Sequence, residues 1–463
     1  MKKLLLGSTA LVVGGVMAAP AMAADPIKIG IGGYYTFYAV AGNVDSTYAF
    51  NGSLTTYRGF AFTQEGEIHF TGQTKLDNGT SVGVLVELEA WNPSSGAGLA
   101  GVNPGANQMI DEAFIFAFGD WGRAELGARD AASYRMYYGT PSALIGWGAI
   151  QHNHNWANAA MMFNNKAYGR TMATTITPIW QDVNRINYFT PRLQGLQIGV
   201  GYAPKLSTTP AGAQAGTGVL GTQNAGTCGF QGPANIGNCP TADSTWQNLF
   251  DIGANYLNKF GDFTVALYGA FAYASFIPAF TPGIGSNIVT GANLAPWKQW
   301  VAGAQFGYAG FTVGGAIGWD NNGLGANYYT GVDNDTRFYT AGIMYETGPW
   351  QMSFMWAGFY NTNGNGSASI TALNTQSGFF AQTLNTAGAT GVPGVNSTAF
   401  NGNPATSLLF GSETVNKWEI GANYALGPGV KITGGAVMFN AGGPSNAVSG
   451  SSWAFLLGMD LRF

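Results

Sequence analysis

The chain of 463 residues has a formal net charge of −4 at pH 7 and contains no run of basic residues. Nucleic acid is therefore not expected as a partner, because binding to phosphates depends on clustered lysine and arginine side chains that displace counterions. Only 9% of the residues are charged, against about a quarter in ordinary globular domains, while 14% are aromatic and 70 residues are glycine. This composition is unusual for a soluble protein.

The first 23 residues have the three parts of a secretory signal peptide. A basic start and a short apolar stretch precede the small-residue cleavage site Ala21-Met22-Ala23, so the mature chain is expected to span residues 24–463. No apolar run in the mature chain is long enough for a transmembrane helix. An exported chain of this composition favours a β-barrel, in which the backbone polar groups pair between strands.

Apolar and polar residues alternate with a period of two in many segments. In the C-terminal WAFLLGMDLRF, large apolar residues such as Leu457 alternate with small or charged residues such as Gly458 and Asp460. The same split recurs in EGEIHF, SVGVLVELE, LQIGVGY and WEIGANYAL. Successive side chains of a strand point to opposite faces, so each of these segments presents one apolar face. A soluble β-sandwich also alternates, and the fold class therefore depends on the connections.

The pattern predicts sixteen strands joined alternately by short turns and long loops. The strands are expected at 27–39, 60–72, 80–91, 108–119, 121–130, 184–190, 195–203, 248–258, 261–275, 297–308, 310–320, 336–347, 349–361, 412–426, 429–440 and 452–463. The long loops are expected at 40–59, 92–107, 131–183, 204–247, 276–296, 321–335, 362–411 and 441–451. This layout predicts an all-β fold, a 16-stranded antiparallel transmembrane barrel with both termini at the short-turn end. Such a barrel encloses more space than side chains can fill, so an aqueous interior is expected.

Cys228 and Cys239 are the only cysteines and both lie in the long loop 204–247. Export would place them in an oxidising compartment, so a disulfide that closes this external loop is expected. Two unlinked thiols are the alternative. His152 and His154 could share one strand face, but no cysteine or carboxylate lies close to them in the sequence, and no metal or cofactor is expected.

Four segments resemble the general porins of Gram-negative bacteria, especially the alphaproteobacterial type. They are EGEIHFTGQTKLDNGTSVGVLVELE, DEAFIFAFGDWGRAELGARD, INYFTPRLQGLQIGVGYAP and the terminal WAFLLGMDLRF, which ends on Phe463. The resemblance implies a homotrimer of sixteen-stranded barrels in the outer membrane, and a loop 131–183 that folds inward as a constriction. Enteric members carry an acidic motif in that loop which this chain lacks, and this departure leaves the ion preference open.

Charged residues on the predicted interior faces are candidates for lining the pore. They are Glu65, Glu67, Glu87, Glu89, Arg123, Glu125, Arg129 and Arg185 on strands, and Arg135, Lys166 and Arg170 in the loop 131–183. Opposed charges across a narrow lumen would create a transverse field that favours polar solutes over apolar ones. The alternative is that some glutamates pair with Arg123 or Arg129 as struts of the wall.

The expected function is passive diffusion of ions and small hydrophilic solutes across the Gram-negative outer membrane, with membrane lipid and further copies of the chain as partners. A substrate-selective channel for sugars or anions is the alternative, although inward aromatics such as Tyr268, Phe338 and Phe359 look too scattered for a binding track. A hydrolase barrel is not expected, because none of the three histidines has a serine close in sequence. A structural barrel capped by the loops 204–247 and 362–411 is the remaining alternative.

Overall fold

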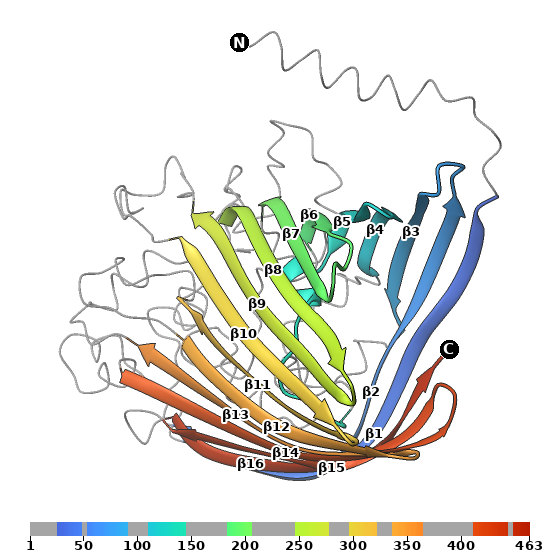
Figure 1. The fold of residues 1–463 in the computed structure, drawn as a ribbon. Helices are drawn as coiled ribbons and strands as arrows, with labels where there is room; N and C mark the ends of the chain where they lie inside the picture. The colour runs from blue at the N-terminus through green and yellow to red at the C-terminus, as the bar shows by residue number, and fades with distance from the viewer. Residues whose placement is uncertain are drawn as a thin grey trace, which may run out of the picture.

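The strands of the protein form a closed antiparallel barrel. The computed structural model describes residues 26–48, 53–90, 110–144, 183–205, 246–276, 296–321, 336–363, 411–442 and 448–463. Within them, each strand pairs with its neighbours in the chain, and the last strand pairs with the first. In Figure 1 the sheet curves round until the red C-terminal strands lie beside the blue N-terminal ones. The predicted fold class and number of strands are confirmed.

Sixteen strands and one short helix make up the described part of the chain. They are β1 (Lys28–Tyr48), β2 (Ser53–Lys75), β3 (Ser81–Glu89), β4 (Ile110–Gly119), β5 (Gly122–Arg129), α2 (Ala132–Arg135), β6 (Val183–Phe189), β7 (Leu196–Lys205), β8 (Trp246–Phe260), β9 (Phe263–Phe276), β10 (Trp297–Tyr308), β11 (Phe311–Asp320), β12 (Thr336–Thr347), β13 (Trp350–Asn363), β14 (Gly411–Gly427), β15 (Val430–Gly442) and β16 (Val448–Arg462). Over these same residues, no helix has the length and hydropathy needed to cross a membrane.

The hairpin β1–β2 is much longer than predicted. Its pairing runs without a break from Lys28↔Gln73 to Tyr48↔Ser53, so the long loop predicted at 40–59 is wrong. The glycine, asparagine, serine and threonine of this stretch are typical of loops. The strand persists because β1 is paired on both sides, with β2 and with β16, and ladder hydrogen bonds override a weak local preference.

The outer face of the barrel is apolar along its strands. On β16, Phe455 and Leu457 are 58% and 62% exposed. The residue before each of them in the chain, Ala454 or Leu456, is buried. Leaving such large side chains in water rather than in an apolar medium costs about 1.5–3 kcal/mol each. The exposed face therefore suits the hydrocarbon of a bilayer, as the alternation predicted.

Short turns connect neighbouring strands at one end of the barrel. Gly79, between β2 and β3, has φ +84°, and Gly261, between β8 and β9, has φ +62°. A residue with a Cβ would lose about 1–2 kcal/mol in this left-handed conformation. The C-terminus lies at the same end, where the Gly33 amide donates to the Phe463 carbonyl at 3.0 Å.

Candidate functional site

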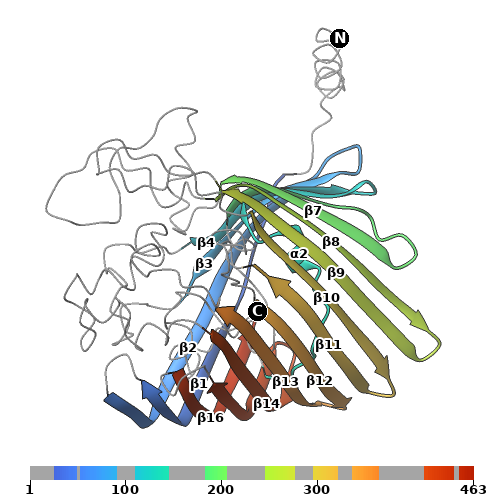
Figure 2. The ribbon, with the colours of Figure 1, turned by 90° about the vertical axis from the view of Figure 1, so that its left-hand side faces the viewer.

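The chain that follows β5 turns into the barrel. Residues 131–144, here called the inner segment, begin with α2 beside β8 and end with Leu144 against β14 and β15. Along the way the segment touches the strands from β7 to β15, always on the face opposite the exposed apolar residues. A segment this short can reach so many strands of a closed barrel only from within. Figure 2 shows α2 near β8 and β9 in the curve of the sheet. The predicted inward folding of this loop is confirmed for its described part.

A buried carboxylate holds the start of the inner segment. Asp251 on β8 accepts hydrogen bonds from the Ser133 amide at 2.8 Å and the Ser133 hydroxyl at 2.7 Å. Its other oxygen lies 3.0 Å from Nη1 of Arg185 on β6, and both charged side chains are almost fully buried. Tyr268 on β9 donates to the Ser133 carbonyl at 2.8 Å. This cluster fixes α2 to the wall, and Asp251 is a residue that the sequence analysis did not single out.

Neutral polar side chains hold the rest of the inner segment. Hydrogen bonds join Asn255 Nδ2 to the Met136 carbonyl (3.0 Å), Gln305 Nε2 to the Gly139 carbonyl (2.8 Å), the Ala143 amide to Ser353 Oγ (2.7 Å) and Asn423 Nδ2 to the Ala143 carbonyl (2.8 Å). Each bond satisfies a backbone group of the segment, which forms no ladder of its own. Near the end of the segment, the Ser142 hydroxyl donates to Glu419, which pairs with Lys417 at 3.3 Å.

Glycines on the wall make room for the inner segment. A Cβ added at Gly303 would overlap the Tyr138 carbonyl oxygen, and one at Gly314 would lie 2.5 Å from the Gly139 carbonyl oxygen. Added Cβ atoms at Gly253, Gly342 and Gly421 would also press on the segment. Real Cβ atoms essentially never approach other atoms so closely, so the glycines on these faces let the segment lie flat on the sheet.

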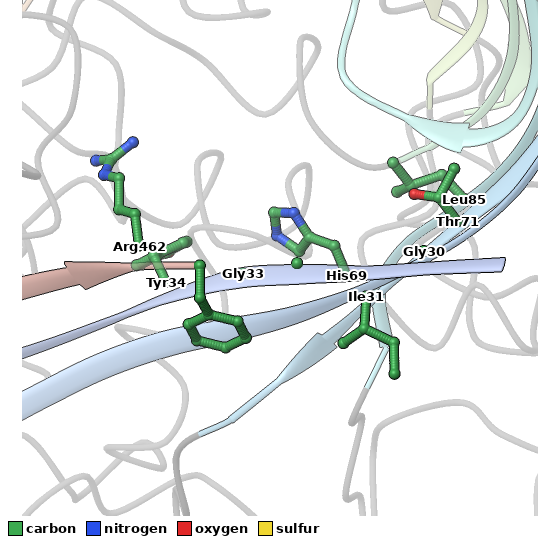
Figure 3. Close-up of a pocket in the computed structure, with 10 residues that line it drawn as sticks. Gly30, Ile31, Gly33, Tyr34, His69, Thr71, Leu85 and Arg462 are labelled. Carbon is green, nitrogen blue, oxygen red and sulfur yellow. The ribbon is translucent and has the colours of Figure 1, made fainter. Parts of the chain in front are cut away.

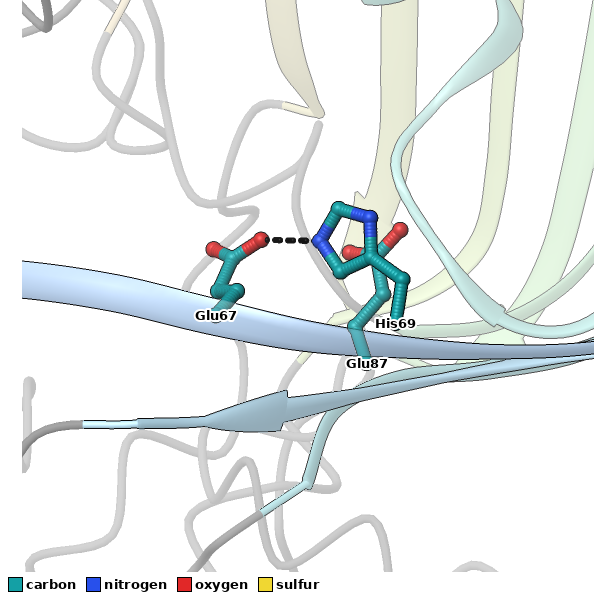
Figure 4. A group of neighbouring side chains, drawn as sticks. All are labelled: Glu67, His69 and Glu87. Carbon is teal, nitrogen blue, oxygen red and sulfur yellow. Dashed lines mark hydrogen bonds and ion pairs between the residues drawn. The ribbon is translucent and has the colours of Figure 1, made fainter. Parts of the chain in front are cut away.

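A different part of the interior, on β2, β3 and β4, is rich in carboxylates. This acidic wall consists of Glu65, Glu67, Glu87, Glu89 and Asp111. Oε2 of Glu67 lies 2.8 Å from Nε2 of His69, and the Tyr34 hydroxyl donates to the other Glu67 oxygen at 3.0 Å. Figure 4 shows Glu67 and His69 of β2 and Glu87 of β3 rising from the same side of the sheet.

Asp111 joins the acidic wall through a β-bulge. The register of β3 and β4 shifts between Val86↔Ala113 and Leu88↔Ile110, so two residues of β4 oppose one of β3. Asp111 then lies with Glu67 and Glu89, and the next residue, Glu112, pairs with Arg129. A strict period of two would place only one of these neighbours inside the barrel, whereas the bulge brings both to interior groups. Two adjacent acidic residues in an otherwise apolar strand were the available signal.

The arginines predicted to line the interior lie beside carboxylates. Arg123 Nε is 2.6 Å from Oε1 of the buried Glu125, and Arg135 of α2 also pairs with Glu125. Arg129 pairs with Glu112 and lies 3.6 Å from Glu87 Oε1. These cations therefore lie on the same side of the barrel as the acidic wall, in the arrangement expected of struts.

Asp130 follows β5 at the start of the loop. Burial raises the pKa of its carboxyl to about 7, and the nearby Arg129 and Arg185 act in the opposite direction. This carboxyl therefore changes charge near neutral pH. Its backbone is held on both sides, because its amide donates to Glu112 at 3.0 Å and its carbonyl accepts from Asn187 at 2.8 Å.

The inward aromatics, which the sequence analysis described as scattered, lie in one cluster. Phe338 and Phe359 are cross-strand partners on β12 and β13, with ring centroids 6.3 Å apart. They and Tyr268 belong to a single buried apolar cluster that includes Met136 and Leu144 of the inner segment. Strand pairing unites residues that are distant in the sequence. Because Phe338 and Phe359 are only 1–2% exposed, they offer no surface to a passing sugar.

Several predicted features fall outside the described residues. They are the signal peptide 1–23, the disulfide of Cys228 and Cys239, the histidines His152 and His154, and the loop cations Lys166 and Arg170. These remain predictions, as does the role of the interior charges in conduction.

Comparison with known proteins gives the family. The sequence profile of the Gram-negative porins matches residues 7–444. An uncharacterized protein of Rickettsia typhi is 23% identical over an alignment of 387 positions, which covers 75% of this chain and 84% of that protein. Among solved structures, the anion-selective porin from Comamonas acidovorans is 13% identical with a TM-score of 0.48, covering 94% of this chain and 100% of that chain. A variant of the Rh. blastica porin is 14% identical with a TM-score of 0.43 at the same coverage. The profile match extends over most of the chain, which therefore belongs to the Gram-negative porin family.

Proposed function

We propose that this porin forms a water-filled channel through which ions and small hydrophilic solutes diffuse passively across the outer membrane. The observation that carries the proposal is the contrast between the outer and the inner face of the barrel. Its outer face is apolar, while its inner face holds the acidic wall and a segment packed on the opposite strands. An interior that concentrates fixed charges stabilises water and ions far better than apolar solutes.

The acidic wall gives the channel a preference for cations. Arg123 pairs with Glu125, and Arg129 divides its charge between Glu112 and Glu87, of which only Glu87 belongs to the wall. Glu67, Glu87, Glu89 and Asp111 of the acidic wall lie in groups whose ligand atoms are within 4.8 Å of one another, so this side of the interior concentrates negative charge. We expect potassium to permeate more readily than chloride.

The homotrimer implied by the resemblance is part of the proposal. Three barrels side by side would conduct in parallel, so a single insertion should close in three equal steps. Closure in one step from a protein that is monomeric in detergent would contradict the trimer and leave the channel intact.

Planar-bilayer recording tests the channel directly. The refolded mature protein should produce stepwise ohmic conductance in KCl, and a KCl gradient should give a reversal potential of the sign expected for cations. Liposomes containing the protein should swell in isotonic sugars at rates that fall smoothly with solute size. A folded barrel that carries no current would overturn the proposal, whereas saturable uptake of one sugar would favour the substrate-selective alternative.

A further inference from the structure

We infer that Glu67, His69 and Glu87 bind a divalent transition-metal cation on the inner wall of the barrel. His69 and Glu87 are cross-strand partners on β2 and β3, and Glu67 precedes His69 by two residues on the same face. One ligand atom from each lies within 4.8 Å of the others. An imidazole nitrogen and two carboxylate oxygens form a ligand set that suits zinc, manganese or iron.

The charge around this trio favours a cation of higher valence. Glu67 also belongs to a second group, with Glu89 and Asp111, whose oxygens lie within 4.8 Å of one another. Carboxylates at such separations repel each other when they are all ionised. The guanidinium of Arg129 is 3.6 Å from Glu87 and also pairs with Glu112. A divalent ion between the strands would neutralise two carboxylates at once.

A pocket gives an ion access to His69. It has a volume of about 470 Å³ and is lined by β1, β2, β3 and the C-terminus, with Tyr34, His69 and Arg462 among its residues. In Figure 3 the His69 ring rises from the sheet on the same side as Arg462, while Ile31 points to the other side. A water molecule occupies only about 30 Å³ in the liquid, so the pocket has room for an ion that keeps part of its hydration shell.

The degree of exposure indicates an exchangeable site. The side chains of His69 and Glu67 are 30% and 16% exposed, so they can be reached from the interior. Three protein ligands would leave coordination positions for water, as in open metal sites and unlike closed structural ones. When the ion binds, the hydrogen bond between His69 and Glu67 breaks, and each atom turns to the metal. Calcium and magnesium are less suited, because they prefer all-oxygen ligands.

Zinc binding to the whole folded protein tests the inference. Calorimetric titration of the detergent-solubilised protein with zinc chloride should show one site, against a background of millimolar magnesium. His69→Gln and Glu87→Gln should each weaken binding at least tenfold, a conservative value because even residues behind the ligands change metal affinity 10–100-fold. Glu346→Gln, at the exposed β12–β13 turn, is the matched control and should bind like the unaltered protein.

The metal site rests on the proposed channel function in one respect only, which is the route by which an ion reaches it. The following readouts distinguish failure of the site from failure of the channel. Circular dichroism and gel mobility without heating confirm that each variant is a folded barrel. Equal zinc affinity in the unaltered protein and in His69→Gln, or full displacement by magnesium, would overturn the site and leave the channel standing. Zinc binding that depends on His69 in a barrel that passes no current would retain the site and reject the channel.

Discussion

The two sides of the barrel interior solve different problems. On β8–β15, glycines such as Gly303 and neutral amides such as Gln305 accept a packed segment, and Asp251 pairs with Arg185 where that segment begins. On β2–β4, carboxylates such as Glu67 are partly exposed and close to one another. One side of the interior therefore holds the inner segment, whereas the other side leaves carboxylates partly exposed. Substitutions that change one side of the interior and leave the other unaltered test this difference.

Loss of the Asp251 charge should have the largest effect. Asp251→Asn removes the carboxylate that faces Arg185 and Ser133 in a buried position. Breaking a buried ion pair costs about 3–5 kcal/mol, because the remaining charge stays desolvated. We expect the free energy of unfolding from lipid vesicles in urea to fall by that amount, and the single-channel current to become noisy.

Asp262→Asn is the control for this substitution, because Asp262 is exposed in the β8–β9 turn. A quiet current and unchanged unfolding in Asp251→Asn would show that α2 does not depend on this anchor.

Filling the space under the inner segment should have the next largest effect. Gly303→Val places a side chain where the Tyr138 carbonyl lies. Overpacking costs about 1–3 kcal/mol and is relieved most easily by displacement of the segment. We expect a change in single-channel conductance with an intact barrel by circular dichroism. Gly269→Val, on β9 where an added Cβ meets nothing within 4 Å, should leave conductance unchanged. The same conductance in both variants would contradict the packing described here.

Neutralising part of the acidic wall should change selectivity more than stability. Glu65→Gln combined with Glu67→Gln removes two charges and keeps the side-chain shapes. A unit charge about 4 Å from an ion contributes about 1 kcal/mol in a water-like medium, and salt screens this further. The ratio of potassium to chloride permeability should therefore fall by a factor of about two to five, measured as a reversal potential in a KCl gradient. An unchanged reversal potential would exclude these glutamates from the conduction path.

A change of pH should have the smallest effect. Because the pKa of Asp130 is raised to about 7, this carboxyl is mostly neutral at pH 6 and mostly charged at pH 8. Cation preference should therefore increase slightly as the pH rises from 6 to 8. Asp130 is surrounded by charged groups that include Arg129, Arg135, Arg185 and Asp111. These groups are the same in the unaltered protein and in the Asp130→Asn variant. Asp130→Asn should show a smaller increase, and an identical pH profile would assign the titration to another group.

Much of the fold was predictable because it depends on one local rule. In the segment around Leu457 and Asp460, exposed apolar side chains alternate with buried or smaller ones, and the same alternation recurs in strands such as β6. It failed at 40–59, where β1 and β2 continue through residues typical of a loop. It failed again at Asp111, where the bulge places neighbours on the same side. In both places, pairing with another strand overrode the local preference.

The sequence by itself determined the barrel, its number of strands and the faces of most charged residues, because a period of two requires no knowledge of distant contacts. Only the tertiary structure decided which interior groups meet. The anchoring of Ser133 by Asp251, the pairing of Phe338 with Phe359 and the approach of Glu87 to His69 all join residues from different strands. Their positions depend on strand register and on the path of the inner segment, and both arise only when the sheet closes.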